Sequence, residues 1–100
     1  MKNIQQIMKQ AQEMQERLQK EMTTMEVETS SGGGMVIVRM NGSKQILELK
    51  IDPEAVDPRE VDMLQDLIVA AVNEAMREVE ERLSSQLGSL AGSLKLPGLM

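Results

Sequence analysis

The sequence predicts an α+β protein: a long helix, a three-stranded antiparallel sheet and a second long helix. Residues 2–25 contain no Gly or Pro and carry apolar side chains at spacings of three and four. Short apolar or alternating segments with turn residues between them follow up to residue 51, and helical spacing returns over residues 58–87. With a length of 100 residues, this pattern predicts one domain over residues 1–87 and a flexible tail over residues 88–100.

The first helix is expected over residues 2–25, which are rich in Gln, Glu, Lys and Met, all good helix formers. Its apolar positions form one narrow stripe, so we expect an amphipathic helix with one partner along its length. The stripe consists of Ile4, Ile7, Met8, Ala11, Met14, Leu18, Met22 and Met25. A helix of this length reaches about 36 Å, more than the width of a small sheet, so part of it should project.

Three strands are expected, over residues 26–31, 35–40 and 45–51. The second, "MVIVRM", is nearly all apolar, which is typical of a strand covered on both faces. In the third strand, alternation places Leu47 on the same face as Leu49 and Ile51, and Ile46 on the opposite face with Glu48 and Lys50.

Two glycine-containing segments are expected to connect these strands. Asn41-Gly42 is a strong hairpin signal, because both residues accept a positive φ in a type I′ turn. A phosphate loop needs glycine amides at the start of a helix, whereas residues 32–34 precede a strand and match no nucleotide-binding motif. We therefore interpret this cluster as a flexible connection.

The second helix is expected over residues 58–87, after a short helical turn at residues 53–56. Asp57 would cap it, Pro58 would take the first helical position, and Gly88 would end it. Its first half is apolar around most of its circumference, as in a helix packed on a sheet and on a partner, and its second half carries many charges. We expect the two helices to pack antiparallel as one projecting arm.

The composition predicts a protein that is not an enzyme and has no cofactor or metal. The chain has no Cys, His, Phe, Trp or Tyr, which excludes the usual zinc sites, catalytic triads and imidazole chemistry. Most carboxylates occupy polar positions of amphipathic helices, so solvated faces are favoured over catalytic pairs. The absence of Cys and of an apolar leader favours a cytoplasmic location, and no apolar run approaches the length of a membrane span.

Neither the charge distribution nor the exposed sheet edges identify the binding partner. The formal net charge is −5, and only the first helix and the tail have a positive balance. Each basic residue could contact phosphate, but ion pairing with nearby acids on solvated faces is the favoured alternative. A three-stranded sheet has edges that need covering, and a two-fold dimer would cover them.

The strings "IMKQAQEMQERLQKEM", "GGGMVIVRMNGSKQILELKIDPEAVD", "DMLQDLIVAAVNEAMREVEE" and "LPGLM" occur in this order along nearly the whole chain. In these strings the chain resembles the YbaB/EbfC family of bacterial nucleoid-associated proteins. The resemblance implies a cytoplasmic, nucleoid-associated and tweezer-like homodimer that binds double-stranded DNA through its helical arms.

Under this resemblance, basic residues toward the free ends of the arms are the candidate phosphate contacts. They are Lys2, Lys9, Arg77 and Arg82, with Arg17 and Lys20 as weaker candidates and Lys95 in the tail as a further one. The end of the second helix carries more acid than base, which favours modest affinity or contact mainly through the first helix. The lack of aromatic residues disfavours base stacking and wedging, so little sequence preference is expected.

Two other functions fit the same architecture. A protein-binding scaffold or holdase would use an apolar, Met-rich inner face of the arms. An accessory factor for replication or recombination proteins could also bind DNA.

Overall fold

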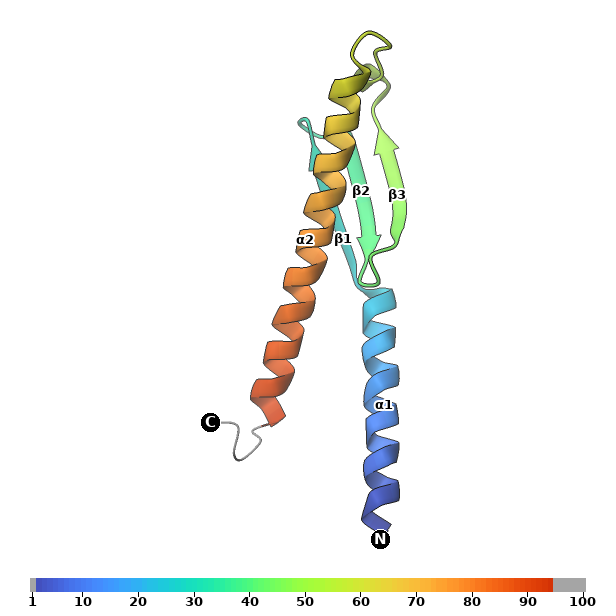
Figure 1. The fold of residues 1–100 in the computed structure, drawn as a ribbon, viewed down its shortest axis with the longest axis vertical. Helices are drawn as coiled ribbons and strands as arrows, with labels where there is room; N and C mark the ends of the chain where they lie inside the picture. Colours follow the sequence, from blue (N-terminus) through green and yellow to red (C-terminus); the bar gives the residue numbers. More distant parts are fainter. Residues whose placement is uncertain (1, 95–100) are drawn as a thin grey trace.

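The computed structural model describes the backbone of residues 2–94 and the side chains of residues 3–89 (Figure 1). It confirms the predicted α+β order of helix, three-stranded antiparallel sheet and helix. The elements are α1 (Lys2–Thr24), β1 (Glu26–Ser31), β2 (Val36–Asn41), β3 (Ile46–Ile51), the 3₁₀ turn η1 (Pro53–Ala55) and α2 (Val61–Leu94).

The sheet has the strand order β1-β2-β3, and α2 packs on one of its faces. Val36, Val38 and Met40 of the central strand are almost fully buried on this face, together with Val27 of β1. On the helix, Ala71, Ala75 and Val79 recur every four residues and are completely buried. Two alanines in this row let the helix backbone approach the strands closely.

Hydroxyl groups of β1 also attach the strand to α2. Thr29 Oγ1 donates to the carbonyl of Ala71 at 2.7 Å, and Ser31 Oγ donates to the carbonyl of Leu67 at 2.6 Å. Thr29 is buried, so this bond satisfies a hydroxyl that would otherwise be costly to bury.

A β-bulge changes the face assignment expected for β3. The register shifts between Arg39 and Met40, so that Met40 pairs with Ile46 while Val38 pairs with Leu49. Ile46 therefore shares the α2-facing side with Leu49, and the prediction that Leu47 takes this place is wrong. An extra residue in one strand reverses the alternation beyond it.

The glycine cluster forms the turn between β1 and β2, as expected for a connection between strands. Gly32, Gly33 and Gly34 have φ values of 61°, 69° and 94°, a region that other residues rarely adopt. The Gly34 amide donates to the carbonyl of Ser31 at 3.2 Å, which closes the turn.

The turn after β2 is not the predicted type I′ turn, because Gly42 has no positive φ and Lys44 has one of 63°. The Asn41 side-chain oxygen accepts the amides of Ser43 and Gln45, each at 3.0 Å, and so organises a longer loop. Gly42 is required there for a different reason, because a Cβ at this position would lie 2.5 Å from the carbonyl oxygen of Met22. Its amide donates to the carbonyl of Met25 at 3.1 Å, where the chain leaves α1.

Helix α2 begins and ends later than predicted. Asp57 accepts the Arg59 amide at 2.9 Å and so stabilises a turn, and the helix begins at Val61 instead of Pro58. Gly88 does not end the helix, which continues to Leu94, because the helical cost of one glycine is only about 1 kcal/mol. Residues 95–100 of the predicted tail lie outside the described residues.

Both helices extend beyond the sheet in the same direction, with opposite chain sense (Figure 1). The molecule is elongated, with extents of 69 × 27 × 16 Å. The predicted close packing of α1 on α2 is not observed, because the two helices leave the sheet at separate points (Figure 1). Asn3 to Arg17 are all exposed.

Candidate nucleic-acid interface

The basic residues of α1 lie on one side of the helix. Lys9 and Lys20 are eleven residues apart, just over three turns, so they project within about 20° of each other. Arg17 lies about 60° from Lys20, and Lys2 falls two turns before Lys9 on the same side. The Lys2 backbone is helical, and its side chain lies outside the described residues.

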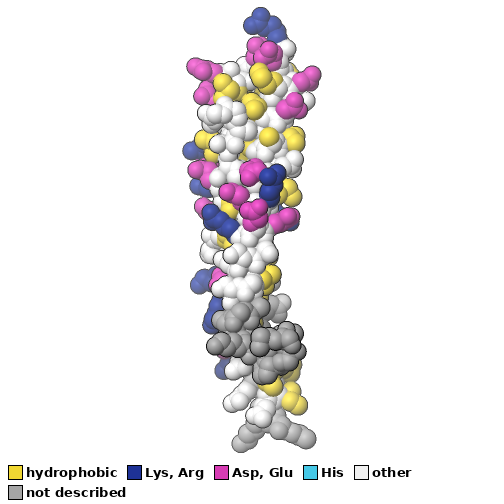
Figure 2. Space-filling model, turned by 90° about the vertical axis from the view of Figure 1, so that its left-hand side faces the viewer, with side chains coloured by type: hydrophobic (Ala, Val, Ile, Leu, Met, Phe, Trp, Pro, Cys, Tyr) yellow, Lys and Arg dark blue, Asp and Glu magenta, His cyan; other side chains and the backbone are white. Residues whose placement is uncertain are grey.

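The opposite side of α1 is apolar. Leu18 follows Lys9 by nine residues, or two and a half turns, and so faces the other way. Ile4, Ile7 and Met8 are 61–63% exposed on this apolar side. Figure 2 shows the same separation, with dark blue side chains along one edge of the projecting part and yellow ones along the other. The amphipathic helix predicted from the sequence therefore presents a basic face and an apolar face in opposite directions.

Ion pairing distinguishes α1 from the rest of the described chain. Lys9, Arg17 and Lys20 have no carboxylate within 4.0 Å among side chains 3–89. Every other described cation except Arg82 has one; these are Arg39, Lys44, Lys50, Arg59 and Arg77. Glu13 and Glu16 share the basic side of α1, so its local charge is modest.

The sequence suggested that Arg77 and Arg82 lie toward the free end of the second helix. The structure does not place them there. Arg77 lies between the buried Ala75 and Val79, at the level of the sheet, and pairs with Glu74 at 3.1 Å. Arg82 Nη1 donates to the Glu26 carbonyl at 3.2 Å, next to β1. Because α2 runs twelve residues beyond Arg82, neither arginine is near its end.

The sequence analysis did not predict a contact between the β2–β3 loop and α2. Lys44 in the β2–β3 loop donates to Glu80 Oε1 of α2 at 2.8 Å. This hydrogen bond, together with the positive charge of Lys44, holds the pKa of Glu80 below its ordinary value of 4.5. Nothing in the spacing of these two residues indicates the pair, and Lys44 has a positive φ of 63° in the loop.

We expect Lys44→Ala to raise the pKa of Glu80 toward its ordinary value, measured by carboxyl ¹³C NMR titration. A depressed native pKa means that the pair contributes stability above the unfolded-state pKa and loses it as the pH falls through the native value. Lys50→Ala, which removes a contact to Glu48, is the control and should leave the Glu80 titration unchanged. An unshifted Glu80 curve in Lys44→Ala would contradict the assigned cause.

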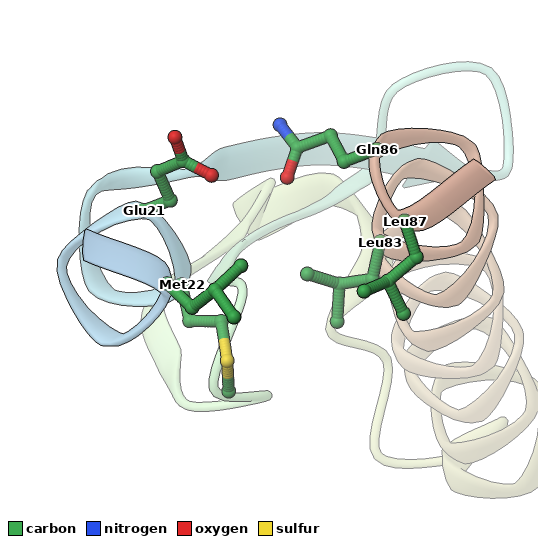
Figure 3. A pocket seen from close by; sticks show the side chains of 6 residues that line it. Glu21, Met22, Leu83, Gln86 and Leu87 are labelled. Atoms are coloured by element: carbon green, nitrogen blue, oxygen red, sulfur yellow. The ribbon is translucent and has the colours of Figure 1, made fainter. Parts of the chain in front are cut away.

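Between the projecting helices lies a hollow of about 170 Å³. Leu18 and Met22 of α1 and Leu83 and Leu87 of α2 line it, with Glu21 and Gln86 also at its wall. Figure 3 shows Met22, Leu83 and Leu87 directed into the space between the helices. An apolar lining of this kind offers no nucleophile or acid–base pair.

Within the described residues, no group of three potential ligands could hold a metal ion. No helix among them is long and apolar enough to cross a membrane.

Comparison with known proteins shows one family. The profile of the YbaB/EbfC DNA-binding family matches residues 1–94. A nucleoid-associated protein of Alkaliphilus metalliredigens is 47% identical over 100 residues, covering 97% of this chain and 88% of the relative. One from Pelotomaculum thermopropionicum is 48% identical, covering 97% and 95%. One from Acetivibrio thermocellus is 50% identical, covering 97% and 89%.

A solved structure shares the fold. The crystal structure of the uncharacterized protein HP0035 from Helicobacter pylori superposes with a TM-score of 0.68 at 23% identity. The match covers 84% of this chain and 98% of that one.

Proposed function

Since the chain belongs to the YbaB/EbfC DNA-binding family, we propose that it binds double-stranded DNA in the bacterial nucleoid as a homodimer, mainly through α1. The observation that carries the proposal is that Lys9, Arg17 and Lys20 of α1 have no carboxylate within 4.0 Å among the described side chains. Lys2 extends the same row in the sequence.

The spacing of the α1 cations suits contact with DNA phosphates. Lys9 and Lys20 are about 16 Å apart along the helix, so they reach separate phosphates of one backbone. An ammonium group recognises a phosphate by charge and carries no sequence information. With no aromatic side chain to insert between bases, binding should show little sequence preference.

The cations of α2 contribute less in this mechanism. Arg77 would have to leave Glu74 before it met a phosphate, and Arg82 already bonds a backbone carbonyl. The assignment therefore moves away from Arg77 and Arg82 and favours contact mainly through α1, one of the alternatives that the sequence left open. Modest affinity is expected, because Glu13 and Glu16 lie on the same side of α1 as the lysines.

Apolar surface that one chain leaves uncovered supports the proposed homodimer. Ile46 and Leu49 of β3 are 51% and 43% exposed, although they share the face that α2 buries on β1 and β2. On α2, Val69 and Met76 lie seven residues apart, in line with Leu83, on the side of the helix that faces α1. A second copy placed against this surface would also cover the free edge of β3.

The test is a DNA-binding titration at several salt concentrations. Four α1 cations per subunit in a dimer give a slope of log K against log [salt] of about −7. Lys9→Gln combined with Lys20→Gln should reduce the slope to about −3.5 and weaken binding by about 10³-fold at 0.1 M salt. The variant should keep its helix content and its oligomeric state.

The matched control is Arg59→Gln combined with Arg77→Gln, which removes the same charge from cations that are already paired. It should leave the slope nearly unchanged. Equal losses in the two double variants would show that net charge, and not the α1 face, determines binding.

A second function, the binding of unfolded polypeptides, is favoured by one observation. The apolar side of α1 carries Ile4, Ile7 and Met8 with more than half of each residue exposed. A holdase would suppress the aggregation of a denatured reporter enzyme, and Ile7→Ser combined with Met8→Ser would abolish that effect. If salt-dependent DNA binding survives these two changes, the basic face of α1 binds DNA independently of its apolar side.

A further inference from the structure

Methionine is the only readily oxidised type of side chain in this protein. The chain has ten Met and no Cys, His, Trp or Tyr. Peroxides convert a methionine thioether to a sulfoxide, which turns an apolar group into a polar hydrogen-bond acceptor. Burial of the described methionines is graded: Met40 is 1% exposed, whereas Met8, Met14, Met63 and Met76 are 36–63% exposed. Oxidation should therefore modify these exposed methionines first.

Met14 differs from the other methionines of α1, Met8 and Met22, in the side chains beside it. Residues three and four positions apart are neighbours on a helix surface, with Cβ atoms about 5–6 Å apart. At these positions Met8 has Ile, Gln and Ala, and Met22 has Leu, Gln, Met and Glu. Met14 alone of the three has a cation there, which is Arg17.

The structure places Met14 and Arg17 in one depression on the surface of α1, together with Gln10 and Glu13. Met14 lies at the edge of the apolar side, and Arg17 lies about 60° around the helix, at the edge of the basic side. The Arg17 guanidinium has no carboxylate within 4.0 Å among side chains 3–89, so Glu13 does not hold it. A new acceptor beside Arg17 would therefore meet donors that no carboxylate engages.

We propose that Met14 is a peroxide-sensitive modification site whose sulfoxide oxygen accepts a hydrogen bond from Arg17. The thioether sulfur attacks hydrogen peroxide: an S–O bond forms, the O–O bond breaks, and water leaves after a proton shift. The sulfur gives up two electrons and the peroxide takes them up, and methionine sulfoxide reductases reverse the change.

The sulfoxide would direct the Arg17 guanidinium toward Met14 and away from a DNA phosphate. This consequence rests on the proposed function, whereas the modification and the hydrogen bond do not. Oxidation of Met14 would thus connect a change on the apolar side of α1 to its basic side.

The hydrogen bond is tested without DNA, by ¹⁵N NMR of the full chain before and after treatment with hydrogen peroxide. Peptide mass spectrometry locates the sulfoxides. Oxidation should shift the Arg17 Nε–H signal and slow its exchange with water by about threefold.

Met14→Leu conserves the side-chain volume but cannot form the sulfoxide, so its Arg17 signal should not respond to peroxide. Met8→Leu is the matched control and should respond like the natural chain, because Met8 has no cation one turn away. An unchanged Arg17 signal in the oxidised natural chain, or an equal response in Met14→Leu, would overturn the proposal.

The effect on DNA is a separate measurement. Oxidation should weaken DNA binding by the natural chain about tenfold, since the proposed dimer has two Arg17 side chains, and a methionine sulfoxide reductase should restore it. Binding by Met14→Leu should not respond to peroxide. An equal loss of binding in oxidised Met14→Leu would show that other methionines cause the effect and would overturn the role of Arg17. A chain that shows the Arg17 shift but binds no DNA in either state would contradict the proposed function alone.

Discussion

Replacing Gly42 with alanine is expected to detach α1 from the sheet, at a cost of about 2–3 kcal/mol in unfolding free energy. A Cβ at this position would lie 2.5 Å from the carbonyl oxygen of Met22 and 2.9 Å from its Cα. Both are backbone atoms of the last turns of α1, so no side-chain rotation can relieve the clash. The helix end must move, and the Gly42–Met25 hydrogen bond is lost with it.

The substitution should disorder α1 and leave the core folded, because α1 has few other attachments. Its residues up to Arg17 are exposed, and an isolated helix of this length is only marginally stable in water. We therefore expect Gly42→Ala to lose helical circular dichroism and amide protection in α1, while β2 and α2 remain protected. DNA binding should fall with the loss of α1 order.

Gly88→Ala is the control for this change. No atom lies within 4 Å of a Cβ built there, and alanine is favoured over glycine within a helix by about 1 kcal/mol. It should stabilise α2 slightly and leave α1 intact. Identical unfolding curves for Gly42→Ala and the natural chain would show that the contact with Met22 is not rigid.

The order of elements could be predicted from the sequence because it depends on local periodicity. The spacing of three and four in residues 2–25 and the glycines at positions 32–34 each identify an element or a turn without tertiary information. The Asn41-Gly42 turn was mispredicted because Gly42 is needed for a tertiary contact, while the local signal indicates a positive φ.

The sequence predicted which basic residues could form the candidate site, but it did not predict which of them form ion pairs with carboxylates. The sequence identifies Lys9, Arg17 and Arg77 alike as cations with acids nearby. Only the folded chain shows that Arg77 is paired with Glu74 and that Lys9 has no carboxylate within 4.0 Å among the described side chains. The position of Arg82 beside β1 depends on where α2 begins on the sheet, and propensity alone places helix ends poorly.

The apolar surface beside β3 gives the other large expected effect. Leu49→Lys combined with Met76→Lys should raise the dissociation constant of the proposed homodimer by at least about 10³-fold, or about 4 kcal/mol. Two-fold symmetry places four new ammonium groups in one interface, and an unpaired charge is costly to bury. Both residues are partly exposed in the single chain, at 43% and 36%, so the monomer should still fold.

Sedimentation velocity measures this change, and Val56→Lys is its control. Val56 is 56% exposed, follows η1 and lies outside the surface formed by β3 and α2, so its replacement should leave the dimer intact. Dissociation should also halve the salt slope of DNA binding to about −3.5, because each monomer keeps its own four α1 cations. If the monomeric variant binds DNA with the full salt slope of about −7, all the phosphate contacts lie within one chain. If the variant remains dimeric, the subunit interface lies on another surface.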